Sequence, residues 1–235
     1  MHRSGTSLVA KIFYEVGADL GPKETLYPGD RWNPDGYYEQ PAIHSINMTL
    51  IHGPFWKFSY FFLPNNHAIL RRAEKLAARI HAAALEYENR LVKETRFCLT
   101  LPTWRAHGAS VSGILVCLRN PEEVVASIRR RLPISESLGY KLWETHLTRL
   151  LENSKDIPLR FVYCNNLLKE NLFLKEISGA LRFFGLRPEE RSLMSFWKKN
   201  IENKKISRPT GGQLYPASVE FLWRELLGRH ERQSA

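Results

Sequence analysis

The chain has 235 residues, 43% of them hydrophobic, and a formal net charge of +10 at pH 7. This apolar content excludes a disordered protein. The sequence has no run of about 18 apolar residues, so we expect no transmembrane segment. It also lacks the apolar segment of a signal peptide, so we expect no secretory leader. Because domains usually span about 100–200 residues, we expect one domain over residues 1–235.

The excess of basic over acidic residues, 34 against 24, indicates an anionic partner. Nucleic acid is the first class that a basic chain suggests. No zinc-finger spacing, basic zipper or RNA-binding signature is present, so we expect no stable nucleic-acid complex. Residues 1–40 contain four basic and six acidic groups, so the excess lies elsewhere in the chain. A small phosphorylated ligand would need only a few of these cations.

The first part of the chain predicts a short helix, a loop and a second helix. Hydroxyl side chains within residues 4–7 can cap a helix, and Gly17 is a natural end for it. Residues 18–41 are rich in Pro and Gly and predict an ordered loop, after which a helix covers about 42–52. The apolar face of the first helix comprises Leu8, Val9, Ile12, Phe13 and Val16.

The centre of the chain contains the clearest helical pattern and three apolar runs. The spacing of apolar residues predicts one helix over 67–92. The run 112–118 is continuously apolar, as in a strand of a parallel sheet that is covered on both faces. Shorter runs predict strands at 96–100 and 159–164. We expect the cysteines near these runs to be buried thiols in a reducing, cytoplasmic compartment: Cys98, Cys117 and Cys164.

Helices are predicted between and after these strands. Asn120 and Pro121 are typical of a helix start, and Arg129–Arg131 lie in the last turn of that helix, where cations are favourable. Alternating strands and helices predict an α/β fold with a largely parallel sheet. The remaining helices are predicted over 136–152, 171–184, 189–200 and 216–229.

Residues 3–7, Arg-Ser-Gly-Thr-Ser, form a candidate anion-binding loop at the start of a helix. Gly5 lets the backbone approach an oxyanion, Thr6 and Ser7 add hydroxyl donors, and the helix N-terminus supplies free N–H groups. Arg3 adds a permanent, forked cation. The segment lacks the Lys of the ATP-binding P-loop, which disfavours a P-loop kinase, and an ordinary helix cap is the alternative interpretation.

A second candidate site follows the strand predicted over 112–118. Arg119 would lie at the carboxyl edge of the sheet, where open α/β sheets bind their ligands. Ser127 lies eight residues later, two turns into the next helix. The alternative is that Arg119 pairs with a carboxylate and Ser127 is a small residue that fills space.

Together these segments resemble the sulfotransferases that use 3′-phosphoadenosine 5′-phosphosulfate (PAPS), in particular the bacterial and tyrosylprotein-type branches. Residues 2–8 are similar to the loop that binds the 5′-phosphosulfate, and residues 118–127 are similar to the motif that binds the 3′-phosphate. Residues 33–39, 93–96 and 164–168 resemble three further family segments. The resemblance implies a P-loop-like, three-layer α/β/α fold with a mostly parallel central sheet.

The sequence departs from the family pattern at several positions. Family members carry an apolar strand immediately before the first loop, whereas this sequence begins at the loop, so we expect either a late start or a sheet without that strand. Glu94 and Thr95 stand where the family has Asp and Pro, and Cys164 replaces a Tyr. The basic C-terminal loop of the family has a loose counterpart in residues 204–208.

The resemblance implies transfer of a sulfuryl group to a hydroxyl or amine, with PAPS as the co-substrate and no metal. Arg3 and Lys93 would neutralise the sulfuryl group and the leaving phosphate. The residues that would hold the nucleotide are Ser4, Gly5, Thr6 and Ser7 for the 5′-phosphosulfate, Arg119 and Ser127 for the 3′-phosphate, and Arg208 from the C-terminal loop.

The acceptor needs a general base, for which there are three candidates. Glu39 lies in the aromatic segment expected to line the acceptor side. Glu24 lies about as far past the loop as the base of the tyrosylprotein-type branch, and His44 is the third candidate because other branches use His. The structural alternatives are a loop-bracing carboxylate for Glu39, an exposed carboxylate for Glu24 and a helix-surface imidazole for His44.

The acceptor is expected to be a small molecule, a glycan or a lipid that carries the hydroxyl. Aromatic residues concentrate between Trp32 and Phe62, where they form either a lid over the acceptor or part of the core. The first alternative function is a nucleotide-binding protein of the same family without catalysis, which the strand missing before the first loop motivates. A less favoured alternative is a basic nucleic-acid-binding protein, which the net charge of +10 motivates.

Overall fold

The structure is a computed structural model that describes residues 2–53, 63–202 and 215–234. The elements of the first half are α1 (Thr6–Glu15), the 3-10 helix η1 (Lys23–Thr25), α2 (Pro41–His52), α3 (Asn66–Glu74), α4 (Ala77–Glu86) and α5 (Phe97–Ala106). Those of the second half are β1 (Ile114–Leu118), α6 (Pro121–Arg129), α7 (Glu136–Asn153), β2 (Leu159–Tyr163), α8 (Cys164–Leu167), α9 (Glu170–Phe183), α10 (Glu190–Asn200) and α11 (Ala217–Ser234).

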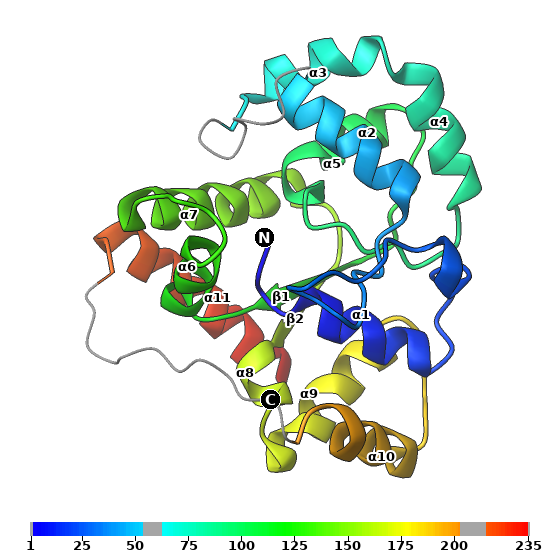
Figure 1. The fold of residues 1–235 in the computed structure, drawn as a ribbon, viewed down its shortest axis with the longest axis vertical. Helices are drawn as coiled ribbons and strands as arrows, with labels where there is room; N and C mark the ends of the chain where they lie inside the picture. The colour runs from blue at the N-terminus through cyan, green and yellow to red at the C-terminus, as the bar shows by residue number, and fades with distance from the viewer. Residues whose placement is uncertain (1, 54–62, 203–214, 235) are drawn as a thin grey trace.

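These elements make an α/β structure, as predicted, in which the described residues form eleven α-helices and one short parallel sheet. Helices α2–α5 lie at one end of the molecule, and α1 and α8–α10 lie toward the other (Figure 1). The helices predicted near the positions of α2, α7, α9, α10 and α11 are confirmed. Within the ranges described, no helix is both long and apolar enough to cross a membrane.

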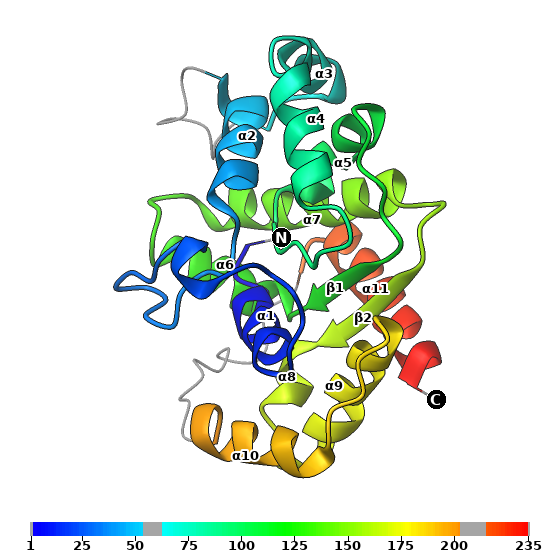
Figure 2. The ribbon, with the colours of Figure 1, turned by 90° about the vertical axis from the view of Figure 1, so that its right-hand side faces the viewer.

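The two strands are parallel and pair in register from Ile114–Leu159 to Leu118–Tyr163. Neighbouring side chains of a strand point to opposite faces of a sheet. Val116 and Phe161 accordingly pack in an apolar cluster with residues of α7 and α11, whereas Val162 packs in a second cluster with residues of α1 and α9. Figure 2 shows the strands between α1 and α11. The sheet therefore divides the described core into two clusters.

In the part of the chain that the structure describes, side chains rather than a third strand cover the outer edge of β2. The side chain of Gln233 donates to the Leu159 carbonyl and accepts from the Phe161 amide, at 2.7 and 2.9 Å. Glu176 accepts from the Tyr163 amide at 2.7 Å. Backbone groups that a strand would otherwise leave unpaired are thus satisfied by α11 and α9.

Residues 97–106 form helix α5, so the strand predicted over 96–100 is wrong. A short apolar run such as Phe97–Leu99 is compatible with a buried strand and with a buried helix. Pro102 lies inside the helix and cannot donate to the Cys98 carbonyl one turn earlier. The side chain of Asn153, on α7, donates to that carbonyl at 2.9 Å instead. A donor that lies far away in the sequence therefore helps this segment to be helical.

The single helix predicted over 67–92 is divided into α3 and α4, so its continuity is wrong. The chain leaves the helical conformation at Leu76, where φ is −112° and ψ is 1°. Leu76 is neither Gly nor Pro, so no local signal marks the break. The predicted apolar face persists across it, because Ile69 and Ile80 are both fully buried.

Helix α6 begins as predicted. The Asn120 side chain accepts from the Glu122 amide at 2.9 Å, and Pro121 occupies the first turn. The Tyr215 hydroxyl also donates to the Asn120 side chain at 2.9 Å. These contacts fix the turn that joins β1 to α6, and Arg119 lies directly before it.

All three cysteines are free thiols, as expected. Cys98 is buried on α5 rather than on a strand, Cys117 is half-buried on β1, and Cys164 is buried at the start of α8. The Cys164 thiol donates to the Ser4 carbonyl at 2.7 Å. The first loop therefore lies directly against the end of β2.

Candidate functional site

The first loop turns at Gly5, immediately before α1. Gly5 has a φ of +80°, in the left-handed region that favours glycine, and a Cβ atom there would lie 2.6 Å from the Cys164 sulfur. Gly5 is also the N-cap of α1 and no side chain caps the helix, so the hydroxyl cap predicted within residues 4–7 is wrong. The first turn of α1 therefore has no side-chain cap, and a helix N-terminus with free N–H groups is able to bind an anion.

The two candidate anion-binding segments are in direct contact. Arg3 Nε donates to Ser127 Oγ at 2.8 Å, and Arg119 Nη1 donates to the Arg3 carbonyl at 3.1 Å. These contacts join residues that lie 124 and 116 positions apart in the sequence. The structure therefore brings the loop before α1 and the strand end before α6 to one place.

Arg119 also has a carboxylate partner, as the alternative interpretation of this residue proposed. Its Nε donates to Glu123 Oε2 at 2.7 Å, and Glu123 Oε1 accepts from Asn165 at 2.9 Å. This pairing leaves Arg119 Nη1 directed at the first loop. Because an arginine carries five N–H donors, a structural ion pair and a ligand contact are compatible in this residue.

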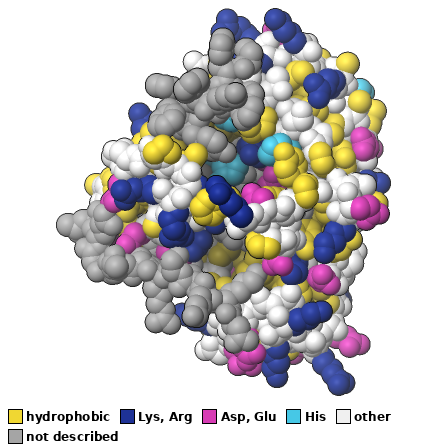
Figure 3. Space-filling view, viewed as in Figure 1, with side chains coloured by type: hydrophobic (Ala, Val, Ile, Leu, Met, Phe, Trp, Pro, Cys, Tyr) yellow, Lys and Arg dark blue, Asp and Glu magenta, His cyan; other side chains and the backbone are white. Residues whose placement is uncertain are grey.

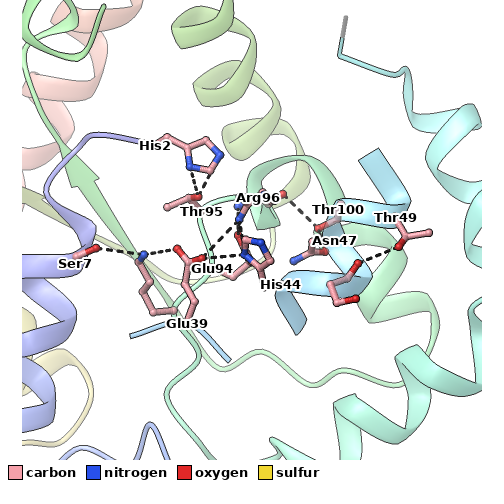
Figure 4. Close-up of polar contacts among 12 residues, drawn as sticks. His2, Ser7, Glu39, His44, Asn47, Thr49, Glu94, Thr95, Arg96 and Thr100 are labelled. Carbon is pink, nitrogen blue, oxygen red and sulfur yellow. Dashed lines mark hydrogen bonds and ion pairs between the residues drawn. The ribbon is translucent and has the colours of Figure 1, made fainter. Parts of the chain in front are cut away.

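Glu39 lies at the centre of a buried cluster of charged side chains (Figure 4). Its side chain forms an ion pair through Oε1 with Lys93, and its Oε2 lies 3.1 Å from His44 Nδ1 and 3.7 Å from Arg96 Nη1. Burial opposes ionisation of this carboxyl, but the hydrogen bond with His44 and the charges of Lys93 and Arg96 outweigh burial and lower the pKa of Glu39 to about 2. Glu39 is therefore ionised at neutral pH.

Arg96 and Glu94 complete this cluster. Glu94 Oε1 accepts from Arg96 Nη1 at 2.7 Å and from the Arg96 amide at 2.9 Å. Glu39, His44 and Glu94 place potential metal ligands within 4.8 Å of one another. Because Lys93 and Arg96 already contact these carboxylates, the cluster has protein cations where a metal ion would otherwise balance the charge.

The two segments and the Glu39 cluster line one cavity of about 690 Å³. Figure 3 shows it as a hollow near the middle of this face, with histidine side chains inside it and basic side chains beside it. A larger cavity of about 900 Å³ lies between α7, β2 and α11. That larger cavity contains no residue of either segment, so the smaller cavity is the candidate functional site. Its wall includes Arg3, Ser7, Glu39, Lys93 and Arg119.

Part of the cavity lining is apolar and carries neutral imidazoles. Ile51 and Leu99 contribute apolar surface there. Burial, followed by the charges of Arg96 and Arg72, lowers the pKa of His52 to about 4. Burial also lowers the pKa of His146 to about 3. These two imidazoles therefore add no positive charge to the cavity at neutral pH.

Arg3 lies near two other arginines and has no carboxylate partner of its own among the described residues. Burial lowers its pKa to about 10, and the neighbouring charges of Arg131 and Arg119 act in the same direction. Among the described residues, no carboxylate forms an ion pair with Arg3. An anion bound here would relieve this repulsion, so the local electrostatics favour an anionic ligand.

The remaining predicted site residues have different outcomes. Ser4 is buried under the loop, where its carbonyl accepts from Cys164. Glu24 is exposed on η1 and does not line the cavity, so the structure does not bring it to the site. His44 is half-buried within the Glu39 cluster rather than on an open helix surface. Arg208, like the aromatic residues 55–62, lies outside the described residues.

Two arginines of the site were not assigned from the sequence. Arg96 belongs to the segment 93–96 that carried the family resemblance, but no role followed from that position. Arg131 lies one turn after Ser127, so helical spacing could have placed both on one face. It contacts the aromatic segment, because its guanidinium lies 5.0 Å from the ring centre of Trp32 and donates to the Trp32 carbonyl at 3.3 Å.

The chemistry of this site follows from two adjacent features. A cationic loop at a helix N-terminus can bind an oxyanion, and a buried ionised carboxylate beside it can accept a proton.

The chain matches no protein-family model, no curated protein and no solved structure.

Proposed function

We propose that this chain transfers a sulfuryl group from PAPS to the hydroxyl, or amine, of an acceptor. The observation that carries the proposal is the 2.8 Å hydrogen bond from Arg3 Nε to Ser127 Oγ. The family resemblance assigns these residues to the two anionic ends of one nucleotide. A protein that binds both ends of that nucleotide needs the two segments close together, and they are in contact.

The donor would be held by groups of the first loop and Arg119, which line the cavity, and by Ser127, which is buried behind Arg3 and does not line it. The N–H groups at the start of α1 and the hydroxyls of Thr6 and Ser7 would hold the 5′-phosphosulfate. Arg119 and Ser127 would hold the 3′-phosphate, with Arg3 between the two anionic ends. The acceptor would occupy the remaining part of the cavity, as a small molecule or as the hydroxyl-bearing end of a glycan or lipid.

The transfer step would need positioning, charge neutralisation and a base. The acceptor oxygen attacks sulfur, the bond between sulfur and the 5′-phosphate oxygen breaks, and its electron pair stays on the phosphate. Arg3 and Lys93 would neutralise the negative charge on the sulfuryl oxygens and the leaving phosphate. Glu39 would accept the proton of the acceptor hydroxyl.

The proposed fold is a P-loop-like, three-layer α/β/α domain around a mostly parallel sheet. Two observations support it: β1 and β2 are parallel, and their side chains pack in two apolar clusters that involve different helices. The candidate loop lies at the carboxyl ends of these strands, where Cys164 and Arg119 contact it. Open α/β sheets bind ligands at that edge.

One observation favours a second candidate function, which is binding of the nucleotide without catalysis. The pKa of Glu39 is lowered to about 2, and a general base is most effective when its pKa lies near the working pH. In its present pairing Glu39 is a weak proton acceptor. The two functions share the same binding site and differ in turnover.

Calorimetric titration with 3′-phosphoadenosine 5′-phosphate tests the binding site. We expect measurable binding by the wild type and a loss of about 10–100-fold in affinity for Arg119→Ala, because a charged hydrogen bond to the 3′-phosphate is lost. The matched control is Arg224→Ala, since Arg224 is exposed on α11 and pairs with Glu220. No binding by the wild type, or equal affinity of Arg119→Ala and wild type, contradicts the assignment.

Product formation distinguishes the two functions. The wild type is incubated with PAPS and a panel of alcohols, phenols, sugars and amines, and released 3′-phosphoadenosine 5′-phosphate is measured by chromatography. Transfer predicts release that depends on the acceptor and is lost in Glu39→Gln while binding is retained. Binding without acceptor-dependent release supports the second candidate instead.

A further inference from the structure

Lys93 contacts both the proposed donor loop and the proposed base. Its ammonium forms the ion pair with Glu39 Oε1 and lies 3.5 Å from Ser7 Oγ, at the start of α1. The Lys93 side chain is only 9% exposed, so water screens these contacts weakly. One cation is therefore shared between the carboxylate and the place where the anionic donor would bind.

The other cationic groups around Glu39 are less able to move toward the donor. Arg96 is held by Glu94 at 2.7 Å and lies 3.7 Å from Glu39. His44 lies on α2, with its ring 4.6 Å from that of Tyr27. Figure 4 shows Ser7 on one side of Glu39, and His44 and Arg96 on the other side. Of the groups that contact Glu39, Lys93 is the one that faces the donor loop.

We propose that Lys93 is a latch operated by the donor: binding of PAPS at residues 3–7 draws the Lys93 ammonium from Glu39 to the sulfuryl group and frees the carboxylate to accept the acceptor's proton. This inference rests on the proposed function. It also explains how a carboxylate that is tightly paired in the free protein can serve as a base, because the pairing is exchanged when the donor arrives.

The exchange follows from the charges involved. A bound phosphosulfate places several anionic oxygens beside Ser7, and these compete with one carboxylate for the same ammonium. Without Lys93, burial of Glu39 favours its neutral form more strongly, although His44 and Arg96 remain in contact. Glu39 then gains affinity for a proton at the moment when the donor is in place. In the transfer step, the proton passes from the acceptor oxygen to Glu39 as the new oxygen–sulfur bond forms and the bond to the phosphate breaks.

The protonation of Glu39 can be read by infrared difference spectroscopy, with Glu39→Gln as the blank. At about pH 4.5, near the ordinary pKa of a glutamate, free wild-type protein should show Glu39 ionised. Addition of PAPS without acceptor should produce the carbonyl band of a protonated carboxyl, because the pKa of Glu39 rises when Lys93 leaves it. Lys93→Met should show the band without PAPS, and PAPS should not increase it.

The matched control is Lys141→Met. Lys141 is exposed on α7 and does not line the cavity, so its loss should leave the response of Glu39 to PAPS as in the wild type. If Lys93→Met does not fold, the wild-type response to PAPS decides the question. Calorimetry on the same samples separates the two proposals. PAPS that binds without changing the Glu39 band overturns the latch alone, whereas absence of PAPS binding overturns the latch and the proposed function together.

Discussion

Glu39 is a buried carboxylate whose two oxygens contact different groups. One oxygen pairs with Lys93, and the other lies 3.1 Å from His44 and 3.7 Å from Arg96. Taking charged groups out of water is unfavourable unless they remain paired. The cluster therefore contributes to folding only while Glu39 is ionised, and acid should remove that contribution.

We expect Glu39→Gln to lower the free energy of unfolding at pH 7 by about 3 kcal/mol, because the amide leaves the buried Lys93 ammonium without its carboxylate partner, whereas Arg96 keeps Glu94. The pKa of Glu39 is lowered from 4.5 to about 2 in the folded protein, so its stabilisation is present above about pH 4.5 and is lost as the pH falls toward 2. Urea denaturation at several pH values measures this. A wild-type advantage that is equal at neutral and acidic pH would contradict the prediction.

Motifs predict the positions of the site residues better than their pairings. Arg3 and Ser127 each stand at a place that local sequence defines, a loop before a helix and the second turn of the next predicted helix. The pairing of Glu39 with Lys93 could not be predicted, because 54 residues separate them and no periodicity relates a loop carboxylate to that lysine. Only the packing of α2 and α5 around the cavity brings them together.

At the scale of elements, α5 depends on a contact with α7. Pro102 prevents the normal hydrogen bond to the buried Cys98 carbonyl, and Asn153 supplies the missing donor at 2.9 Å. A buried carbonyl without a donor is costly, so the two helices stabilise each other through this bond. Because Lys93 and Arg96 directly precede α5, the same contact helps to hold the charged cluster in place.

Asn153→Ala is expected to lower the free energy of unfolding by about 1–2 kcal/mol, because the Cys98 carbonyl loses its donor. Thermal or urea denaturation measures the change. Asn200→Ala is the control, since Asn200 donates to the Phe196 carbonyl of its own helix near the end of α10. If the two variants have equal free energies of unfolding, the hydrogen bond from Asn153 to the Cys98 carbonyl does not stabilise the protein more than the control bond does.

The contact between α5 and α7 also explains why the strand predicted over 96–100 was wrong, whereas other elements were predicted correctly. Helix α6 carries its own start signals, Asn120 and Pro121, and local sequence therefore predicts it. Residues 97–101 carry no such signal, and the partner that completes their helix comes from α7. The break between α3 and α4 is similarly unmarked, because neither Gly nor Pro stands at Leu76.

At the scale of the whole molecule, net charge is a poor guide to where an anion binds. Residues 1–40 carry more acidic than basic groups, yet Arg3 belongs to them and lies in a region where Arg119 and Arg131 repel it. The cationic site arises from three segments that meet at the carboxyl edge of the sheet. A ligand that bridges these segments should therefore stabilise the fold as a whole.

Thermal denaturation with two nucleotides tests this bridging. At about 100 times its dissociation constant, 3′-phosphoadenosine 5′-phosphate should raise the melting temperature by roughly 5–10 °C, which corresponds to about 2.7 kcal/mol for a chain of this length. At the same concentration, adenosine 5′-phosphate should raise it less, because it has no 3′-phosphate to contact Arg119 and Ser127. Ser127→Ala should reduce the difference between the nucleotides, whereas Ser192→Ala, an exposed change on α10, should not. Equal stabilisation of the wild type by both nucleotides would show that the segment at Ser127 does not bind a 3′-phosphate.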